Sequence, residues 1–318
     1  MMRDASAAQF AADVRHSLSL APRQVASLYL YDALGSALFD AICHLPWYRV
    51  TRTETELLER HGARILDAAA PLGRIVELGS GSGAKLATLL GRRHARATPL
   101  SLRLIDVSPS ALDTAMRSLG QLPGIEVEGY QAAYERGLDT LAAEAAPDGR
   151  TLALFLGSNI GNFDPPAAHA LLVRIRAALR PGDALLLGAD LVKPEADLLL
   201  AYDDPLGVTA AFNLNLFVRM NRELGANFDV AGLRHVAVWN PEASRVEMHA
   251  EATRDQHVRI PVATLDFALS AGERIWTESS YKYRAGDAAA ILARAGFRQA
   301  EQWLDAEAGF ALTFAEAR

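Results

Sequence analysis

Between residues 74 and 191, short apolar segments alternate with helical ones, and this alternation is the feature that most constrains the fold. The apolar segments read "RIVELG", "SLRLIDV", "IEVEGYQ", "TLALFLGS" and "DALLLGADL". Each is nearly continuous in apolar residues, as is typical of strands whose two faces are both covered. Helical stretches separate them, as in parallel strands joined by crossover helices. The pattern therefore predicts an α/β fold with a doubly wound sheet.

After Lys193-Pro194 the pattern changes. Two helical stretches, "EADLLLAYDD" and "GVTAAFNLNLFVRMNREL", precede the segments "HVAVWN", "RVEMHAEAT", "QHVRIPV" and "TLDFAL". These segments alternate apolar and polar residues, as half-exposed antiparallel strands do. The stretch "RVEMHAEATRDQHVRI" predicts a hairpin that turns near Arg254-Asp255.

The last stretch, "DAAAILARAGFRQAEQWLDAEAGFALTFAEA", predicts a helix and two strands that complete the first sheet. We therefore expect residues 51–194 with 283–318 to form an α/β domain. Residues 1–50 with 195–282 would form an inserted α+β module.

A glycine-rich turn, "ELGSGSG", follows the first strand and precedes a helix. Gly79, Gly81 and Gly83 allow positive φ and a close approach of the backbone to a ligand, and the start of the following helix offers unpaired N–H groups. The turn by itself fits dinucleotides and S-adenosylmethionine about equally. It lacks the G-x-G-x-x-G spacing of dinucleotide-binding sites, which argues against a dinucleotide.

Asp106, at the end of the second strand, could accept two hydrogen bonds from a ribose diol. Asp106 therefore supports a nucleoside ligand but does not distinguish a dinucleotide from S-adenosylmethionine. A role as a plain helix cap is better served by Ser108, which precedes Pro109. At the end of the third strand Ala132 and Ala133 cannot bind an adenine amino group, whereas Gln131 or Glu135 could, and Tyr134 could lie against the adenine face.

The fourth strand ends in "LFLGSNIGNFDPP", a loop with two asparagines. Ligands of open α/β sheets bind at the carboxyl ends of the strands, so we expect this loop to line the site. Asp164 accounts for a cap on the next helix, but capping requires neither asparagine.

In "WTESSYKY", Glu278 and Ser280 would share one face of a strand. Together they could bind both nitrogens of an imidazole, although the spacing alone also fits solvent-exposed strand residues.

Composition narrows the classes of partner. The 318 residues carry a formal net charge of −6, which favours neither nucleic acid nor an anionic membrane. No apolar run of about 18 residues is present, and the first residues lack the apolar core of a secretory signal.

The single cysteine, Cys43, suits a reducing cytoplasm. His235, His249 and His257 lack metal-ligand spacing and are interpreted as core or surface residues. We expect a cytoplasmic monomer with no metal.

Five stretches together resemble the L-histidine Nα-methyltransferases of ergothioneine biosynthesis. They are "YDALGSALFDAICHLPWYRVTRTE", "ELGSGSGAK", "FLGSNIGNF", "LLLGADLVKPEADLLLAYDDPLGVTAAFNLN" and "TESSYKY". The resemblance covers nearly the whole chain, and these motifs follow one another in the family's order. The resemblance implies a Rossmann-like class I methyltransferase fold, S-adenosylmethionine as cofactor and L-histidine as substrate. It also implies hercynine, the trimethylated betaine, as product.

The resemblance further implies that residues 51–194 with 283–318 are the S-adenosylmethionine-dependent methyltransferase domain, and that residues 1–50 with 195–282 are the substrate-binding module. It also implies two sets of site residues. The cofactor would be bound by Gly79, Ser80, Gly81, Lys85, Asp106 and Tyr134. The substrate would be bound by Tyr31, Tyr48, Gly157, Asn162, Tyr202, Met248, Glu278 and Ser280. Within the second set, Glu278 and Ser280 match the pair that holds the imidazole, and Met248 lines its pocket. Tyr31 or Tyr202 would accept the amine proton or hold the lone pair in line.

The chain departs from the family pattern in two places. Where the family has an acid followed by phenylalanine at the adenine, this chain has Ala133-Tyr134. Where the family commonly has "YYPTRTE", this chain has "YRVTRTE". The second change puts the cation of Arg49 next to Tyr48.

Three alternatives stay open at this point: a nicotinamide-dependent oxidoreductase, a binding protein without catalysis, and a methyltransferase for another amine.

Overall fold

The computed structural model describes residues 2–92 and 99–318 and divides into two compact units. Unit 1 comprises Met1–Tyr48 and Pro194–Ser280, and unit 2 comprises Arg49–Lys193 and Tyr281–Arg318. These boundaries differ from the sequence-based domain boundaries by a residue or two. The assignment of cofactor to one unit and substrate to the other stays a prediction.

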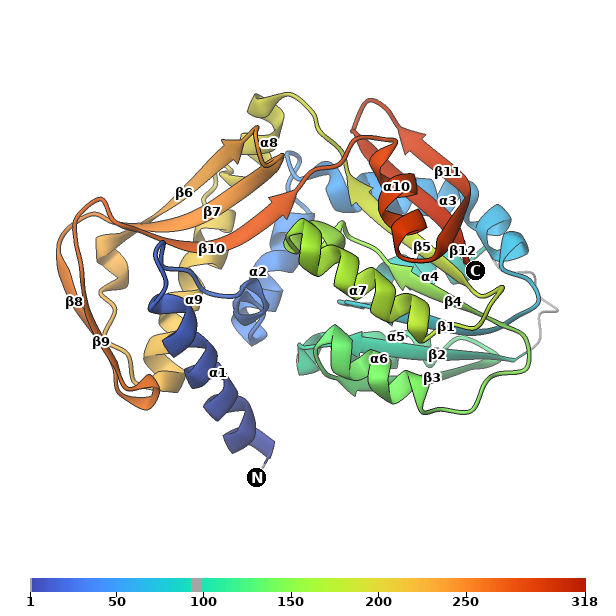
Figure 1. The fold of residues 1–318 in the computed structure, drawn as a ribbon, viewed down its shortest axis with the longest axis horizontal. Helices are drawn as coiled ribbons and strands as arrows, with labels where there is room; N and C mark the ends of the chain where they lie inside the picture. Colours follow the sequence, from blue (N-terminus) through green and yellow to red (C-terminus); the bar gives the residue numbers. More distant parts are fainter. Residues whose placement is uncertain (1, 93–98) are drawn as a thin grey trace. The chain divides into compact units, whose positions relative to one another are not determined.

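Unit 2 contains a seven-stranded sheet in the order β11-β12-β5-β4-β1-β2-β3 (Figure 1). The strands are β1 (Leu72–Leu78), β2 (Leu100–Asp106), β3 (Ile125–Gln131), β4 (Arg150–Phe155), β5 (Ala184–Asp190), β11 (Phe297–Asp305) and β12 (Phe310–Ala317). β1 to β5 are parallel, whereas β12 pairs antiparallel with both β5 and β11. The doubly wound α/β sheet predicted from the sequence is confirmed, including its completion by the last two strands.

Helices cover both faces of this sheet. α6 (Tyr134–Ala142), α7 (Pro165–Ala177) and α10 (Asp287–Arg294) pack on one face, where their apolar residues join side chains such as Leu187 and Ala189 in one buried cluster. Gly188, between these two residues, points to the opposite face, and a Cβ there would meet the side chain of Glu54 in α3 (Arg49–Ala68). α4 (Ala84–Leu90) and α5 (Pro109–Leu119) follow α3 on that face.

The ends of these helices follow from their capping residues. Ser108 accepts a hydrogen bond from the N–H of Ala111 at the start of α5, and Asp164 accepts one from Ala167 at the start of α7. Proline occupies the first turn of both helices, where its missing N–H costs nothing. Ala133, at the start of α6, supplies no such bond.

Unit 1 is built around a long helix, α9 (Val208–Leu224), which contacts most other elements of the unit. The remaining helices are α1 (Met2–Leu18), α2 (Ala33–Cys43) and α8 (Glu195–Tyr202). β10 (Arg274–Tyr281), β7 (Arg245–Ala252) and β6 (Leu233–Asn240) form a three-stranded sheet in that order, and β8 (Gln256–Ile260) pairs with β9 (Leu265–Leu269). The predicted pairing of β7 with β8 around Arg254-Asp255 is wrong, because β7 lies between β6 and β10 and β8 belongs to the other sheet.

A close backbone contact fixes the start of α2. Asp32 accepts hydrogen bonds from the N–H of Gly35 and from the side chain of Asn215, and it pairs with Arg222. A Cβ at Gly35 would lie 1.7 Å from the carbonyl oxygen of Leu30, so only glycine fits there. This contact holds the segment that contains Tyr31 against α2. Burial acts to raise the pKa of Asp32, but its hydrogen bonds, above all the one from Arg222, lower it overall.

None of the helices in residues 2–92 and 99–318 is long and apolar enough to cross a membrane.

Candidate active site

The glycine turn between β1 and α4 is left-handed at each glycine. φ is +76° at Gly79, +50° at Gly81 and +76° at Gly83, a region that residues with a Cβ rarely adopt. A Cβ at Gly79 would lie 2.6 Å from the side-chain nitrogen of Asn159, so that side chain covers this glycine. A Cβ at Gly81 would meet no atom within 4 Å. The turn therefore offers open space beside Gly81.

Two carboxyl groups border this turn. Glu77 is buried with 2% of its surface exposed, and this burial raises its pKa to about 8, with Lys85 opposing the shift. Asp106 accepts hydrogen bonds from the N–H groups of Gly81 and Ser108, each at 2.9 Å. Burial raises the pKa of Asp106 as well, against these backbone donors. The turn thus lies in a region of acidic side chains.

This set of residues fits S-adenosylmethionine. Asp106 suits a ribose diol, and the buried carboxyl group of Glu77 offers a hydrogen-bonding partner to the polar groups of that molecule. Oε2 of Glu77 and Oγ of Ser80 are both buried and have no hydrogen-bond partner among the residues that the structure describes. Buried polar atoms are normally satisfied, so these two atoms are consistent with a polar ligand beside the turn.

A buried ion pair joins this turn to the fourth-strand loop. Nζ of Lys85 lies 2.5 Å from Oε2 of Glu54, whose side chain is fully buried. The N–H of Gly157 donates to both oxygens of the same carboxylate, at 3.0 and 2.8 Å. A Cβ at Gly188 would lie 1.9 Å from Oε1 of Glu54, so the glycine in β5 makes room for the carboxylate. Glu54 therefore holds two predicted site residues, Lys85 and Gly157, at fixed positions.

Tyr134, the first residue of α6, also reaches the glycine turn. Its ring contacts Phe155 and Phe163, with centroids 5.5 and 6.2 Å apart. Its hydroxyl lies 2.7 Å from the place of a Cβ at Gly79. Burial raises the pKa of this tyrosine, so its hydroxyl stays protonated.

In unit 1, three predicted tyrosines belong to one aromatic cluster. The hydroxyl of Tyr202 donates to Oγ of Ser280 at 2.7 Å. The ring of Tyr48 lies edge to face with that of Tyr202, with centroids 6.2 Å apart. Phe39 joins Tyr48 to Tyr31, at 6.2 and 5.5 Å. The structure therefore brings Tyr31, Tyr48, Tyr202 and Ser280 together.

The predicted imidazole residues lie on β10 and β7. Glu278 and Ser280 stand two residues apart in β10, and both are buried, with 9% and 5% of their surface exposed. They are therefore not solvent-exposed strand residues. Met248 on the adjacent strand β7 is also buried, and its carbonyl oxygen accepts a hydrogen bond from Thr277 at 2.9 Å.

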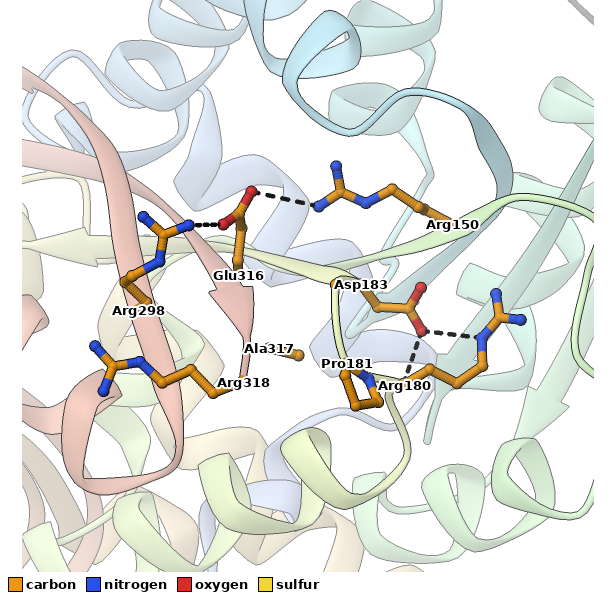
Figure 2. Close-up of a pocket in the computed structure, with 9 residues that line it drawn as sticks. Arg150, Arg180, Pro181, Asp183, Arg298, Glu316, Ala317 and Arg318 are labelled. Carbon is orange, nitrogen blue, oxygen red and sulfur yellow. Dashed lines mark hydrogen bonds and ion pairs between the residues drawn. The ribbon is translucent and has the colours of Figure 1, made fainter.

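A pocket of about 640 Å³ lies elsewhere, at the amino ends of the parallel strands of unit 2 (Figure 2). Arg150 and Arg298 both pair with Glu316 there, and Arg180 lies 3.6 Å from Asp183. None of the predicted site residues lines this pocket. In unit 2 the predicted residues gather instead at the carboxyl ends of β1, β2 and β4, as expected for a doubly wound sheet.

Residues 10–317 match the family of histidine-specific, S-adenosylmethionine-dependent methyltransferases. The chain belongs to this family. It is accordingly a methyltransferase that uses S-adenosylmethionine, and the oxidoreductase alternative is wrong. Membership also argues against a binding protein without catalysis.

Two relatives agree with this membership, and one solved structure shares the fold. A histidine N-alpha-methyltransferase from Mycolicibacterium smegmatis is 42% identical, over 98% of this chain and 96% of that protein. Ergothioneine biosynthesis protein 1 from Neurospora crassa is 29% identical, over 89% of this chain and 32% of that protein. The crystal structure of a possible exported protein from Bordetella parapertussis has a TM-score of 0.50, 16% identity and coverage of 99% and 96%. This last likeness shows a shared fold alone.

The two remaining substrate residues predicted for this methyltransferase belong to unit 2. Gly157 has φ +74°, and Asn162 ends the short 3-10 helix Asn159–Asn162. Between them Ser158 adopts φ +57°, and its Oγ accepts a hydrogen bond from the N–H of Asp190. Arg49, the departure next to Tyr48, pairs with Glu307 at 3.2 Å, with 44% and 88% of the two side chains exposed.

Three residues around the site are not among the predicted site residues. Glu54 lies in the quoted stretch "TRTE", and Glu77 ends the stretch "RIVE" before the turn, but neither position alone predicts burial. His235, interpreted as a core or surface residue, lies 2.8 Å from the carbonyl oxygen of Tyr202. Among the described residues no group of three or more His, Cys, Asp or Glu could hold a metal ion.

Proposed function

We propose that this methyltransferase transfers methyl groups from S-adenosylmethionine to the α-amino group of L-histidine. Successive transfers would give the trimethylammonium betaine hercynine, a step of ergothioneine biosynthesis. One observation carries the proposal: a member of a histidine-specific family has a buried carboxylate, hydroxyl and thioether on neighbouring strands, beside a cluster of tyrosines. The name of the fungal relative supports the pathway.

We assign Glu278 and Ser280 to binding of the substrate's imidazole. A carboxylate accepts from one ring N–H, and a hydroxyl can donate to the other ring nitrogen. Met248 would pack against the ring as a polarizable apolar wall. In this assignment Glu278 recognises the substrate and takes no proton from the amine.

S-adenosylmethionine supplies an electrophilic methyl group on a sulfonium. When bound, it would give this methyl group to the lone pair of the amine nitrogen, and the carbon–sulfur bonding pair would stay on sulfur as a neutral thioether. Each attack requires an uncharged amine, so the ammonium form loses one proton before each methyl transfer. We propose that Tyr31 or Tyr202 accepts a hydrogen bond from the amine and orients its lone pair, or relays its proton to water by passing on the hydroxyl proton. Tyr48, Gly157 and Asn162 would hold the amino and carboxylate groups, so the protein acts chiefly by positioning.

For the cofactor we propose Gly79, Ser80, Gly81, Lys85, Asp106 and Tyr134. Ala133 supplies no side-chain acceptor for the adenine amino group, and we propose that Tyr134 contacts the adenine face. A monomeric state and a cytoplasmic location also stay proposals, based on composition.

The test is mass spectrometry of the products formed from a panel of amino acids and S-adenosylmethionine with an isotopically labelled methyl group. We expect label in histidine, with mono-, di- and trimethylated species in succession. A reaction without enzyme is the blank. Label in another amine, with histidine unchanged, would retain the methyl-transfer chemistry but refute the proposed substrate.

A further inference from the structure

Tyr202 is the last residue of α8, and its carbonyl group has an unusual partner. Carbonyls in the last turn of a helix lack intrahelical donors and need another. For Tyr202 this donor comes from β6, where Nε2 of His235 lies 2.8 Å from the carbonyl oxygen. A histidine side chain thus caps the residue whose hydroxyl contacts Ser280.

The hydrogen bonds around His235 determine which ring nitrogen carries the proton. Nδ2 of Asn213 lies 3.0 Å from the carbonyl oxygen of His249, which can only accept, so Nδ2 donates there. The same Nδ2 lies 2.8 Å from Nδ1 of His235 and donates its second hydrogen to it. Nδ1 is therefore an acceptor, and the ring proton is on Nε2, facing the carbonyl of Tyr202. Burial also lowers the pKa of His235, which agrees with a neutral ring.

Tyr202 is consequently held at both of its ends. Its hydroxyl binds Ser280 on β10, and its carbonyl binds His235 on β6. These two strands are the outer strands of one three-stranded sheet, and β7, which carries Met248, lies between them. A shift of the end of α8 relative to this sheet would disturb both contacts.

We propose that His235 is a positioning residue for Tyr202 in the methyl-transfer reaction. It acts through the backbone of Tyr202: the Nε2–H bond fixes the end of α8, and so keeps the phenol at Ser280. This inference rests on the proposed function, which places Tyr202 and Ser280 at the substrate. His235 itself touches neither substrate nor cofactor in this scheme.

Two substitutions at His235 distinguish the effect of losing the hydrogen-bond donor from the effect of losing the volume of the ring. The side-chain amide of His235→Gln can extend to the place of Nε2 and donate to Tyr202, whereas His235→Asn reaches only the place of Nδ1. We expect His235→Asn to lower kcat/KM for L-histidine about 10- to 100-fold, the scale of a misplaced reacting group. His235→Gln should recover most of that loss. Equal losses in both variants would overturn the proposal.

His257→Asn is the matched control. It is the same substitution in the same unit, but the side chain of His257 lies on β8 and is 65% exposed. We expect kcat/KM to be unchanged. The affinity for S-adenosylhomocysteine, measured by calorimetry, should be unchanged in all three variants. Should His235→Asn not fold, His235→Met, which fills the volume without a donor, takes its place.

A double-mutant cycle distinguishes positioning from a general structural role. If His235 acts through the hydroxyl of Tyr202, His235→Asn will cost less than about threefold in kcat/KM in a Tyr202→Phe background, because coupled residues are not additive. A full additional loss in that background would overturn the proposal.

A crystal structure of the His235→Asn variant gives an answer that does not depend on activity. We expect the Tyr202–Ser280 hydrogen bond to be lost there and kept in His235→Gln. Retention of this bond in both variants refutes the positioning role. By contrast, a wild-type enzyme that leaves histidine unmethylated refutes the proposed function and leaves the structural comparison valid.

Discussion

Lys85 and Glu54 form an ion pair, with 2.5 Å between Nζ and Oε2, beneath the loop that carries Gly157. The carboxylate is fully buried, and the ammonium is 19% exposed. The charge of Glu54 therefore depends on Lys85 for compensation. Removal of one member of such a pair leaves a buried charge, which is costly.

Lys85→Met should lower the free energy of unfolding by about 3 kcal/mol or more. Glu54→Gln in the same chain should restore part of this loss, because a neutral amide can still accept from Gly157. Urea denaturation of the two variants and the wild type measures both effects. A loss below about 1 kcal/mol for Lys85→Met would mean that the pair is solvated.

Gly81→Ala tests whether the cofactor lies on the turn. The new methyl group would meet no protein atom within 4 Å, so the cost to stability is the left-handed backbone alone, about 1–2 kcal/mol. It would occupy the space that we assign to the cofactor, and we expect the affinity for S-adenosylhomocysteine to fall at least about tenfold.

Gly124→Ala is the control for this variant, because Gly124 also has positive φ and open surroundings, at +71°. Calorimetry should show wild-type affinity for Gly124→Ala. Unchanged affinity in Gly81→Ala would move the cofactor away from the turn.

Ala133→Asp should stabilise the protein and strengthen cofactor binding together. Ala133 already has the extended backbone of an N-cap, with φ −63° and ψ 156°, but its side chain makes no capping bond. An aspartate there should add about 0.5–2 kcal/mol to the free energy of unfolding, and its second oxygen could accept from the adenine amino group.

Ala133→Ser separates the two effects, since serine caps a helix but has a single side-chain oxygen. Thermal denaturation should rank both variants above the wild type. Calorimetry with S-adenosylhomocysteine should show tighter binding for aspartate alone, and equal affinities would exclude a contact between this position and adenine.

Glu77 should make the stability of the protein depend on pH. Burial raises its pKa to about 8 from the ordinary glutamate value of 4.5, so the folded state holds a proton that the unfolded state has lost. Between about pH 5 and 8, the free energy of unfolding should fall by about 1.4 kcal/mol per pH unit relative to Glu77→Gln. Below and above this range the difference should be constant. Denaturation of both proteins across this range measures it, and parallel curves would show that Glu77 is ionised throughout.

Glu278→Ala should raise the KM for L-histidine about 10- to 100-fold, the value of a hydrogen bond to a charged group, and relax selectivity toward other aromatic amino acids. The kcat should change less, since the carboxylate is assigned to recognition. Steady-state kinetics with histidine and phenylalanine checks both expectations. Glu273→Ala, which removes a partly exposed partner of Arg23, is the control, and an unchanged KM in Glu278→Ala would refute the imidazole assignment.

The sheet of unit 2 could be predicted because its signal is local. Each strand is a continuous apolar run, and the order of helices and strands leaves few ways to wind a parallel sheet. The pairing of β7 was predicted wrongly for the opposite reason. Adjacent segments such as 245–253 and 256–262 favour a hairpin, but β10, further along the chain, takes the place beside β7.

The site shows the same division between local and distant information. The positive φ of Gly79 and the cap at Ser108 follow from short motifs. The burial of Glu54 depends on the absence of a side chain at Gly188, far along the chain. His235 likewise gains its role only from the end of α8 and from Asn213. No spacing rule connects such positions, so their contacts had to come from the structure.

The discontinuous composition of unit 1 has a consequence for synthesis on the ribosome. Its first part, Met1–Tyr48, leaves the ribosome before its second part, Pro194–Ser280, has been translated. Residues 49–193 lie between, and at the usual elongation rates this delay is on the order of ten seconds. During that time the apolar faces of α1 and α2 lack their partner helix α9. The nascent chain therefore has to remain unaggregated, alone or bound to a chaperone, until that helix emerges.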